Sequence, residues 1–222
     1  MTDLKWTAWQ LADSAFPAGG FAHSGGLEAA IQSGAIGDAE SLGLAMRAVL
    51  NQAAFGALPA VLAVVQDPRK FAEVERRLDA VLTNHVVYRA SVAQGQALLS
   101  AGPRIFRVES LSNWASDCRK HGRPGHLASV FGYLAACLGM DARQASHLFL
   151  FTSMRSALSA AVRLGAIGPI AAQTLLQELI PEAHRLADQA LSLTLDDLHQ
   201  TLPLFDILQS GQDRLYSRLF QS

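Results

Sequence analysis

Cysteine, lysine and β-branched residues are scarce in this sequence, and each shortage excludes a class of protein. Two cysteines, Cys118 and Cys137, are too few for the disulfide framework of a small secreted domain, so we expect a reducing compartment. The chain has only 12 Val, 7 Ile and 7 Thr, against 37 Ala and 33 Leu. Because β-branched side chains lose rotamers in a helix, this balance predicts an all-α protein.

Positive charge is also limited. The 18 basic and 19 acidic residues give a net charge of −1 at pH 7. Nucleic-acid binding needs a clustered basic field, so we expect no nucleic-acid partner. Of the basic residues, 15 are Arg and 3 are Lys. Arg forms planar, bidentate pairs that tolerate burial, so this bias favours protein interfaces, although a GC-rich coding sequence would produce it too.

No hydrophobic run marks a leader or a membrane span. The first residues, MTDLKWTAWQLADS, hold no apolar core of signal-peptide length. The longest uncharged stretch, residues 48–66, would make a poor spanning helix because four polar or helix-breaking residues interrupt it: Asn51, Gln52, Gly56 and Pro59. We therefore expect a cytoplasmic protein with no membrane contact.

The helical pattern predicts one domain over residues 1–222, an all-α bundle of roughly eight to ten helices. No stretch alternates polar and apolar residues as a strand would. Asp38 and Asp141 are expected N-caps, and Gly165 is an expected left-handed stop. The predicted helices run from the Ser24 or Gly25 cap to about residue 33, from the Asp38 cap through Ala53, and over residues 59–66, 68–102, 127–138, 142–163, 169–180 and 181–190.

Two of these boundaries depend on an apolar stripe and on a proline. One apolar stripe from Phe71 to His85 predicts a single helix over 68–102 with His85 facing the core. Pro181 is expected to separate the last two helices, because proline removes a helical hydrogen bond. Residues 103–125 are expected to be irregular.

The sequence PAGGFAHSGGLEAA, residues 17–30, holds four of the 17 glycines. A phosphate loop is excluded because Gly26 stands where its lysine is required. The relaxed A-x-S-x-G around Ser24 favours, as an alternative, a serine hydrolase with Ser24 as nucleophile. That alternative requires strands on both sides of Ser24, and the sequence offers none.

A structural bend over residues 17–26 explains the same stretch without a catalytic or phosphate-binding role. Pro17 sets a turn, and Gly19 and Gly20 supply backbone angles that side chains would obstruct. Phe21 and His23 would then lie at the rim of this glycine bend.

A short helix is expected to follow the bend. Ser24 or Gly25 caps it, and Gly26, which we also count among the residues of the structural turn, follows the cap. With Gly25 as the cap, Glu28 is the third helical residue and can reach back to an unpaired amide.

The spacing Cys118-x-x-His121, with His126 five residues later, raises the possibility of a zinc or nickel site. No fourth ligand lies nearby, and three cationic side chains are interspersed: Arg119, Lys120 and Arg123. We therefore expect neither a metal nor another cofactor.

Small residues recur every fourth position in the helix predicted over 142–163, so they form one smooth row that lets another helix approach closely. The row fits an internal helix crossing or a dimer contact. Its members are Ser153, Ala157, Ala161 and Gly165.

The segment 211–222, which we call the tail, contains the residue types that anchor interfaces. It either folds back on the domain or is flexible and becomes ordered on a partner. The candidate partner-binding side chains are Arg214, Tyr216, Ser217, Arg218, Leu219 and Phe220.

Three motifs in order resemble the UreF family of urease accessory proteins over essentially the whole chain. SALSAAVRLGAIGP at 156–169 and YSRLF at 216–220 follow an N-terminal signature that includes Gln10-Leu11, Pro17, Gly19-Gly20-Phe21, Ser24 and Gly26-Leu27-Glu28. Gly25 and Gln221 depart from the family pattern, where a larger polar and a basic residue are common. His23 matches no fixed family position.

The resemblance implies an all-α, cytoplasmic, non-catalytic protein that dimerises. It implies a complex with the accessory protein UreD (also called UreH) and the GTPase UreG, which helps insert nickel into apo-urease. It also implies that Glu28 matches an acidic family position, that the bend with Phe21 is structural or faces a partner, and that residues 216–220 belong to a docking tail.

Overall fold

The computed structural model of this protein describes residues 4–222 and is all-α, as the composition predicts. These residues form eleven α-helices and four short 3-10 helices, with no strand among them. The elements are α1 (Leu4–Ala12), η1 (Gly20–Ala22), α2 (Leu27–Gln32), α3 (Ala39–Gly56), α4 (Leu58–Gln66), η2 (Pro68–Lys70), α5 (Phe71–Val81), α6 (His85–Phe106), α7 (Glu109–Lys120), α8 (Leu127–Cys137), α9 (Ala142–Arg163), α10 (Pro169–Ala190), η3 (Leu195–Asp197), α11 (Pro203–Ser210) and η4 (Gln212–Arg214).

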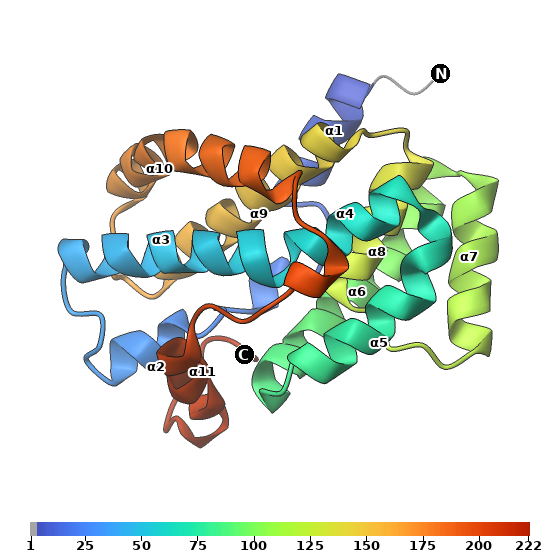
Figure 1. Cartoon of the computed structure of the whole chain (residues 1–222). Helices are drawn as coiled ribbons and strands as arrows, with labels where there is room; N and C mark the ends of the chain where they lie inside the picture. The colour runs from blue at the N-terminus through green and yellow to red at the C-terminus, as the bar shows by residue number, and fades with distance from the viewer. Residues whose placement is uncertain (1–3) are drawn as a thin grey trace.

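Helix α4 lies at the centre of the core, where it packs against α8, α9 and α3 (Figure 1). Leu58, Val61 and Val64 of α4 are fully buried. The helix approaches α8 closely because α8 carries Gly132 at the contact: a Cβ there would lie 2.5 Å from the Val61 carbonyl oxygen. Apolar burial and this close backbone approach together hold the centre of the bundle.

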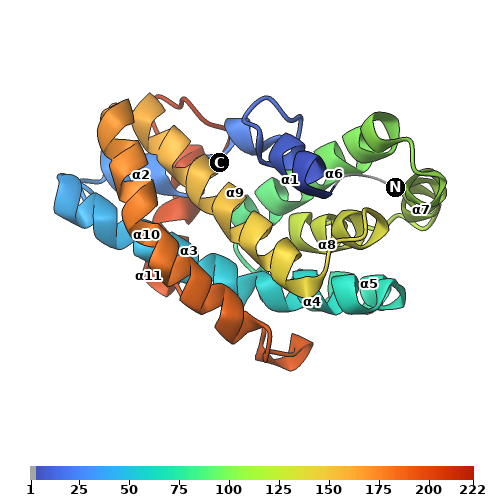
Figure 2. The ribbon, with the colours of Figure 1, turned by 90° about the horizontal axis from the view of Figure 1, so that it is seen from above.

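Two helix groups flank this centre (Figure 2). Helices α9 and α10 pack together and both contact α3 at one end, whereas α6 packs on α7 and α8 at the other. Helices α2 and α11 contact each other below α3 in Figure 1, beside the C-terminus. The last helix of the chain is thereby brought to the first glycine-rich segment.

The expected helix ends at acidic caps and glycines are confirmed. Asp38 accepts a hydrogen bond from Ser41 N–H, and the Ser41 hydroxyl accepts from Asp38 N–H, which completes a capping box at α3. Asp141 forms the same box with Gln144 at α9. Gly165 follows α9 with a φ of 72°, in the left-handed region that glycine adopts at no steric cost.

The expected single helix over 68–102 is wrong, because the chain breaks between α5 and α6. The Asn84 side chain accepts hydrogen bonds from Val86 N–H at 2.9 Å and Val87 N–H at 3.4 Å, so it caps a new helix. The break turns His85 away from the core: its side chain is exposed and lies 3.2 Å from Asp213.

The expected stops at prolines are also wrong. Helix α6 runs through Pro103 to Phe106, and α10 runs through Pro181 without a break. Proline removes one helical hydrogen bond, and here packing of the apolar faces outweighs that loss. The 103–125 region, expected to be irregular, contains α7, whose buried residues follow helical spacing: Leu111, Trp114, Ala115 and Cys118.

The segment Ala39–Gln66 is long and apolar enough to cross a membrane by composition alone. It comprises α3 and α4, and the chain changes direction at Ala57, whose φ and ψ of −139° and −44° are not helical. Half of its most apolar stretch is buried inside the domain. These two helices supply core packing.

Candidate functional site

The glycine bend crosses between α6 and α9. Gly19 has a φ of 73°, and a Cβ at Gly19 would lie 3.3 Å from the Ala97 Cβ on α6. A Cβ at Gly20 would lie 3.4 Å from the Ser156 hydroxyl on α9 and 3.5 Å from the Gln94 side chain on α6. The two glycines therefore let the backbone lie close to both helices at once, while Pro17 stays exposed.

Helix α2 starts at Leu27, one residue later than expected with Gly25 as the cap. Gly26 is its N-cap, with a φ of 91°, and a Cβ at this position would meet the Phe205 ring of α11 at 2.8 Å. Gly26 therefore serves both the helix start and the contact between α2 and α11.

Glu28 does not reach back to an amide of its own helix, so the expected half capping box is wrong. It is 1% exposed, and its carboxylate accepts hydrogen bonds from three groups of the tail. Leu219 N–H donates at 2.6 Å, Phe220 N–H at 3.1 Å and Gln212 Nε2 at 2.7 Å. The buried charge is stabilised by donors almost 200 residues away in the sequence.

The tail lies folded on the domain, the first of the two arrangements that the sequence left open. Its backbone pairs with the end of the bend: Gln221 N–H donates to the Ala22 carbonyl at 2.8 Å. The Ser222 carbonyl accepts from Ser24 N–H, and from the Ser24 hydroxyl at 3.1 Å. His23 Nδ1 lies within hydrogen-bond distance of the Ser222 hydroxyl.

Arg163, at the end of α9, joins the bend and the tail through its flat guanidinium. Its central carbon lies 3.6 Å from the Phe21 ring centroid and 4.2 Å from the Phe220 ring centroid. One of its terminal nitrogens also donates to the Phe21 carbonyl. Phe220 is 4% exposed, whereas Phe21 is 69% exposed. Arg stacks on aromatic faces in this way because it is planar and weakly hydrated.

The tail also carries an ion-pair cluster around Asp213. Arg89 on α6 donates two hydrogen bonds to this carboxylate, at 2.8 and 3.2 Å, and Arg218 donates one at 3.2 Å. The hydrogen bonds from Arg89 are the main reason that the pKa of Asp213 is lowered. His85 completes the cluster.

The remaining tail side chains predicted to bind a partner point outward. Tyr216 is fully exposed, Leu219 is 53% exposed, and Arg214 is exposed as well. Ser217 is exposed, and its carbonyl accepts from Gln32 Nε2 at 3.0 Å. Of the predicted set, the structure therefore places Phe220 and Glu28 inside and leaves the others accessible.

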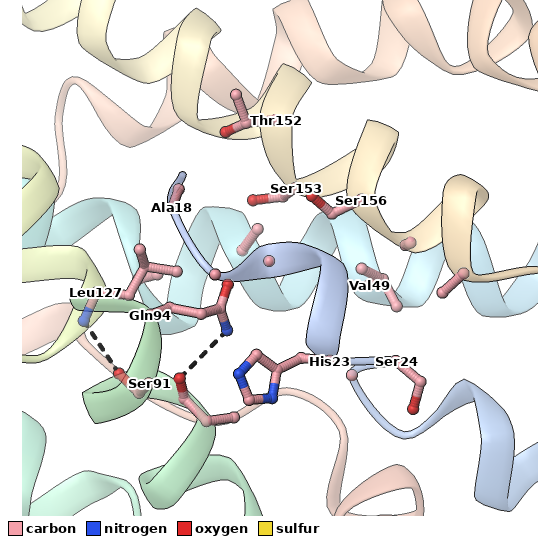
Figure 3. Close-up of a pocket in the computed structure, with 18 of the residues that line it drawn as sticks. Ala18, His23, Ser24, Val49, Ser91, Gln94, Leu127, Thr152, Ser153 and Ser156 are labelled. Atoms are coloured by element: carbon pink, nitrogen blue, oxygen red, sulfur yellow. Dashed lines mark hydrogen bonds between the residues drawn. The ribbon is translucent and has the colours of Figure 1, made fainter. Parts of the chain in front are cut away.

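A cavity of about 740 Å³ lies between α6, α9 and the bend (Figure 3). Phe131 and Phe149 contribute apolar walls, and Phe220 of the tail is also part of its lining. Hydroxyl and amide groups face one another across the space, with Gln94 on α6 and Ser153 on α9. Residues of the bend also belong to the lining of this cavity.

His23, at the rim of the bend, also lines the cavity. Burial lowers the pKa of His23, and the positive charge of Arg89 lowers it further. The imidazole therefore favours its neutral form, which can pair with the Ser222 hydroxyl.

Ser24 is not placed as a nucleophile. It is 2% exposed, and its hydroxyl donates to the Ser222 carbonyl. The nearest imidazole, His23, pairs with Ser222 instead, and no strand flanks Ser24 anywhere in residues 4–222. The serine hydrolase alternative lacks both its relay and its fold.

The Cys118, His121 and His126 residues do not converge on a metal site. Cys118 is buried, His121 pairs with Asp117 at the surface, and His126 is buried elsewhere. Among the described residues no three His, Cys, Asp or Glu side chains are arranged to hold a metal ion. Burial raises the pKa of Cys118 to about 11, which keeps it a thiol.

A polar network around Glu75 was missed by sequence reasoning. Glu75 is 3% exposed and accepts from Gly125 N–H at 2.6 Å, from His126 N–H at 2.9 Å and from the Ser129 hydroxyl. The carboxylate thus binds the unpaired amides at the start of α8. Glu75 lies four residues after Phe71 and three before Leu78 on α5, a helical spacing that places it on the same side as these two apolar residues.

His126 continues this network with two further contacts. Its Nε2 lies 3.1 Å from Asp79, and its Nδ1 lies 3.1 Å from the Ser91 hydroxyl. The same hydroxyl accepts from Leu127 N–H at 3.3 Å, an amide of the first turn of α8. The network therefore anchors α8 on α5 and α6.

The small-residue row of α9 packs within the protein. Ala157 and Ala161 are buried, and Ser153 faces the cavity. Gly165 ends the row in open space, with no atom within 4 Å of an added Cβ. The two buried alanines favour the internal helix crossing that the sequence left as one of two alternatives.

Comparisons with known proteins agree along nearly the whole chain. A UreF family profile matches residues 36–180. The chain is similar to "Urease accessory protein F" of Oryza sativa subsp. indica, 35% identical over 97% of this chain and 84% of that protein. It is similar to the protein of the same name in Arabidopsis thaliana, 34% identical over 99% and 93%. "Urease accessory protein UreF" of Arthrobacter sp. (strain FB24) is 29% identical over 96% and 95%.

Proposed function

Because the chain belongs to the UreF family of urease accessory proteins, we propose that it acts in urease maturation as a non-catalytic scaffold. In this proposal it joins a UreD-type accessory protein (also called UreH) and a UreG-type GTPase in the cytoplasm. The complex inserts nickel into apo-urease, and the scaffold regulates the GTP-dependent step. Nickel is the cargo of the process, and the chain itself needs no cofactor.

The observation that carries this proposal is the likeness to urease accessory proteins along almost the full chain, and the three sequence motifs lie within that likeness. The fold adds a reason to expect binding: apolar and cationic side chains project from the tail with no role in the core. Tyr and Arg are the residue types that dominate protein interfaces. They are available to a partner while the domain stays folded.

The test is co-purification of the full chain with a UreD-type and a UreG-type protein. We expect a stable complex, and we expect Tyr216→Ala to weaken it about tenfold, because an exposed aromatic anchor is lost. Ile170→Ala is the matched control, since Ile170 is 85% exposed on α10, outside the tail. The proposal fails if the full chain binds neither protein and urease acquires its nickel normally without the chain.

Homodimer formation is part of the proposal and has its own test. The buried alanines of α9 are occupied inside the protomer, so a dimer would use another surface. Sedimentation of the purified chain across a tenfold concentration range should show a dimer. A monomer at all concentrations contradicts this part and leaves the scaffold role intact.

A further inference from the structure

The lining of the cavity between α6 and α9 includes two hydrogen-bond donors that no described residue satisfies. Five buried side-chain atoms among the described residues have no hydrogen-bond partner, and two of the five belong to residues that line this cavity. They are the Nε of Arg155 and the Nε2 of Gln200, and both are donors. A buried donor without an acceptor is costly, so the lining favours an occupant that supplies acceptors.

Arg155 belongs to a polar face of α9 that is turned to the cavity. Spacings of three and four residues place Thr152, Arg155, Ser156 and Ser159 on one face of the helix, and all four line the cavity. Three of the four carry hydroxyl groups, so Arg155 is the one charged member of this set. An acceptor that reaches this face meets a guanidinium among hydroxyl donors.

The positive charge of Arg155 has no paired carboxylate among the described residues. Burial lowers the pKa of Arg155, and only the more distant negative charge of Asp13 opposes this effect. The Asp13 carboxylate is exposed and accepts a hydrogen bond from Ala15 N–H at 2.7 Å. A guanidinium stays protonated under these conditions, and its planar donors match the two oxygens of a carboxylate.

The amide of Gln200 is held in one orientation by its neighbours. Its Oε1 accepts from Gln52 Nε2 at 2.7 Å, and Gln52 Oε1 accepts from Thr201 N–H at 2.7 Å. A main-chain N–H can only donate, so the Gln52 amide cannot be reversed, and it fixes the Gln200 amide in turn. The Gln200 Nε2 therefore stays a donor without an acceptor.

The rest of the lining suits an apolar body. Phe131 and Phe149 meet edge to face in the wall, with their ring centroids 5.1 Å apart, and Val49 and Leu98 add aliphatic surface. The volume of about 740 Å³ is in the usual range for small-molecule sites. Such sites combine mainly apolar walls with a few polar groups that fix the orientation of the ligand.

We propose that this cavity binds a small organic anion, with a carboxylate on Arg155 and an apolar body against the phenylalanine walls. A hydroxyl or carbonyl oxygen elsewhere on the ligand would satisfy Gln200. Asp206 also lines the cavity and would repel a second carboxylate, so we infer a ligand with a single negative charge. The site belongs to the isolated chain and is independent of the proposed scaffold role.

Octanoate is the probe, because it joins one carboxylate to an apolar chain. Its binding to the full chain is measured by isothermal titration calorimetry, and 1-octanol supplies the same apolar chain without the charge. We expect one octanoate to bind per chain. Arg155→Gln should weaken octanoate binding about tenfold and leave octanol binding unchanged, because only the carboxylate uses the guanidinium.

Arg104→Gln is the matched control. Arg104 is exposed on α6 and is not part of the cavity lining, so this variant should bind octanoate as the wild type does. If Arg155→Gln does not fold by circular dichroism, Ser153→Leu replaces it. A leucine there fills part of the cavity, and we expect it to weaken both octanoate and octanol about tenfold.

Three results would overturn the anion site. One is no binding of octanoate to the wild type at about 10 mM, which is weaker than any specific site of this kind. Another is equal octanoate affinity of the wild type and a folded Arg155→Gln or Ser153→Leu variant. The third is octanoate binding no tighter than that of octanol. Each would mean that water alone satisfies the two donors.

Discussion

The contact between α4 and α8 and the contact between the bend and the tail both depend on glycine, yet they are built differently. At the first, Gly132 lets two helix backbones meet with apolar side chains all around. At the second, Gly19 and Gly20 bring the bend close to α6 and α9, and the bend and α2 then meet the tail through polar contacts. Close packing of apolar atoms is hard to replace, whereas hydrogen bonds to a carboxylate can be exchanged.

The difference shows where this protein can change shape. The contact between α4 and α8 is made by apolar side chains and close backbone packing, so opening it costs the full packing energy. The bend and the tail are held together by hydrogen bonds, and a second protein could supply equivalent donors and acceptors. We therefore expect the molecule to keep one rigid half while the other half exchanges contacts.

The largest effect is expected from a methyl group in the core. Gly132→Ala places a Cβ 2.5 Å from the Val61 carbonyl oxygen, so α4 and α8 must separate. We expect a loss of about 3 kcal/mol in the free energy of unfolding and a fall in Tm of roughly 10 °C. Gly43→Ala in α3 is the control, because no atom lies within 4 Å of its added Cβ, and its Tm should not fall. Equal Tm values for the two variants would contradict the close approach.

A smaller loss of stability but a large local change is expected from Glu28→Gln. Gln cannot accept three hydrogen bonds with the same charge, so the tail should detach at a cost of about 2 kcal/mol. Hydrogen exchange should speed up at residues 219–222, and trypsin should cleave sooner at Arg214 and Arg218. Glu73→Gln should behave as wild type. Loss of the whole fold before the tail exchanges would mean that the two regions are not separable.

A pH effect smaller than that of Glu28→Gln is expected at His23. Its pKa is lowered by burial and by Arg89 while the tail is folded on the domain, so this arrangement binds the proton less readily than an imidazole with the ordinary pKa of 6.5. Attachment of the tail is therefore fully stabilised by this group above pH 6.5 and weakens as the pH falls through the lowered pKa. Tail protection measured from pH 7.5 to 5.5 should decrease in wild type and stay flat in His23→Asn.

The ion pairs of Asp213, unlike the contact of His23, should not change between pH 7.5 and 5.5. Arg89 holds the pKa of this carboxyl below its usual value of 3.8, so its ion pairs persist throughout that range and are lost only in stronger acid. A steep decrease below pH 4 in both wild type and His23→Asn is the expected sign of Asp213. A flat wild-type profile between pH 7.5 and 5.5 would contradict the role of His23.

The smallest effect is expected at the two native cysteines. Cys118 is fully buried with a pKa of about 11, and burial also raises the pKa of the half-buried Cys137. At pH 8 we expect almost no alkylation of Cys118 in the folded protein and slow alkylation of Cys137, with rapid reaction of both in denaturant. Rapid reaction of Cys118 in the native state would show that the core opens as easily as the tail.

Much of the fold could be predicted from local chemistry. Asp38, Asp141 and Gly165 act within a few residues of themselves, so their positions in the sequence are enough to place helix ends. The break at Asn84 was missed because an apolar stripe continues across it, and Pro181 was misread because packing outweighs its local cost.

The candidate site was less predictable because its contacts are not local. Glu28 was singled out by its position near a helix start, yet its donors are Gln212, Leu219 and Phe220. Nothing near Glu28 in the sequence indicates that the tail returns to it. The resemblance to UreF selected both segments, and only the three-dimensional structure shows them in contact.

The hydrogen bonds between Glu28 and the tail have a consequence for how the sequence can diverge. The carboxylate binds main-chain amides of Leu219 and Phe220, so it recognises the path of the chain and ignores the outward side chains. Related proteins could therefore vary the exposed positions to match their own binding partners and still keep the same hydrogen bonds to the carboxylate.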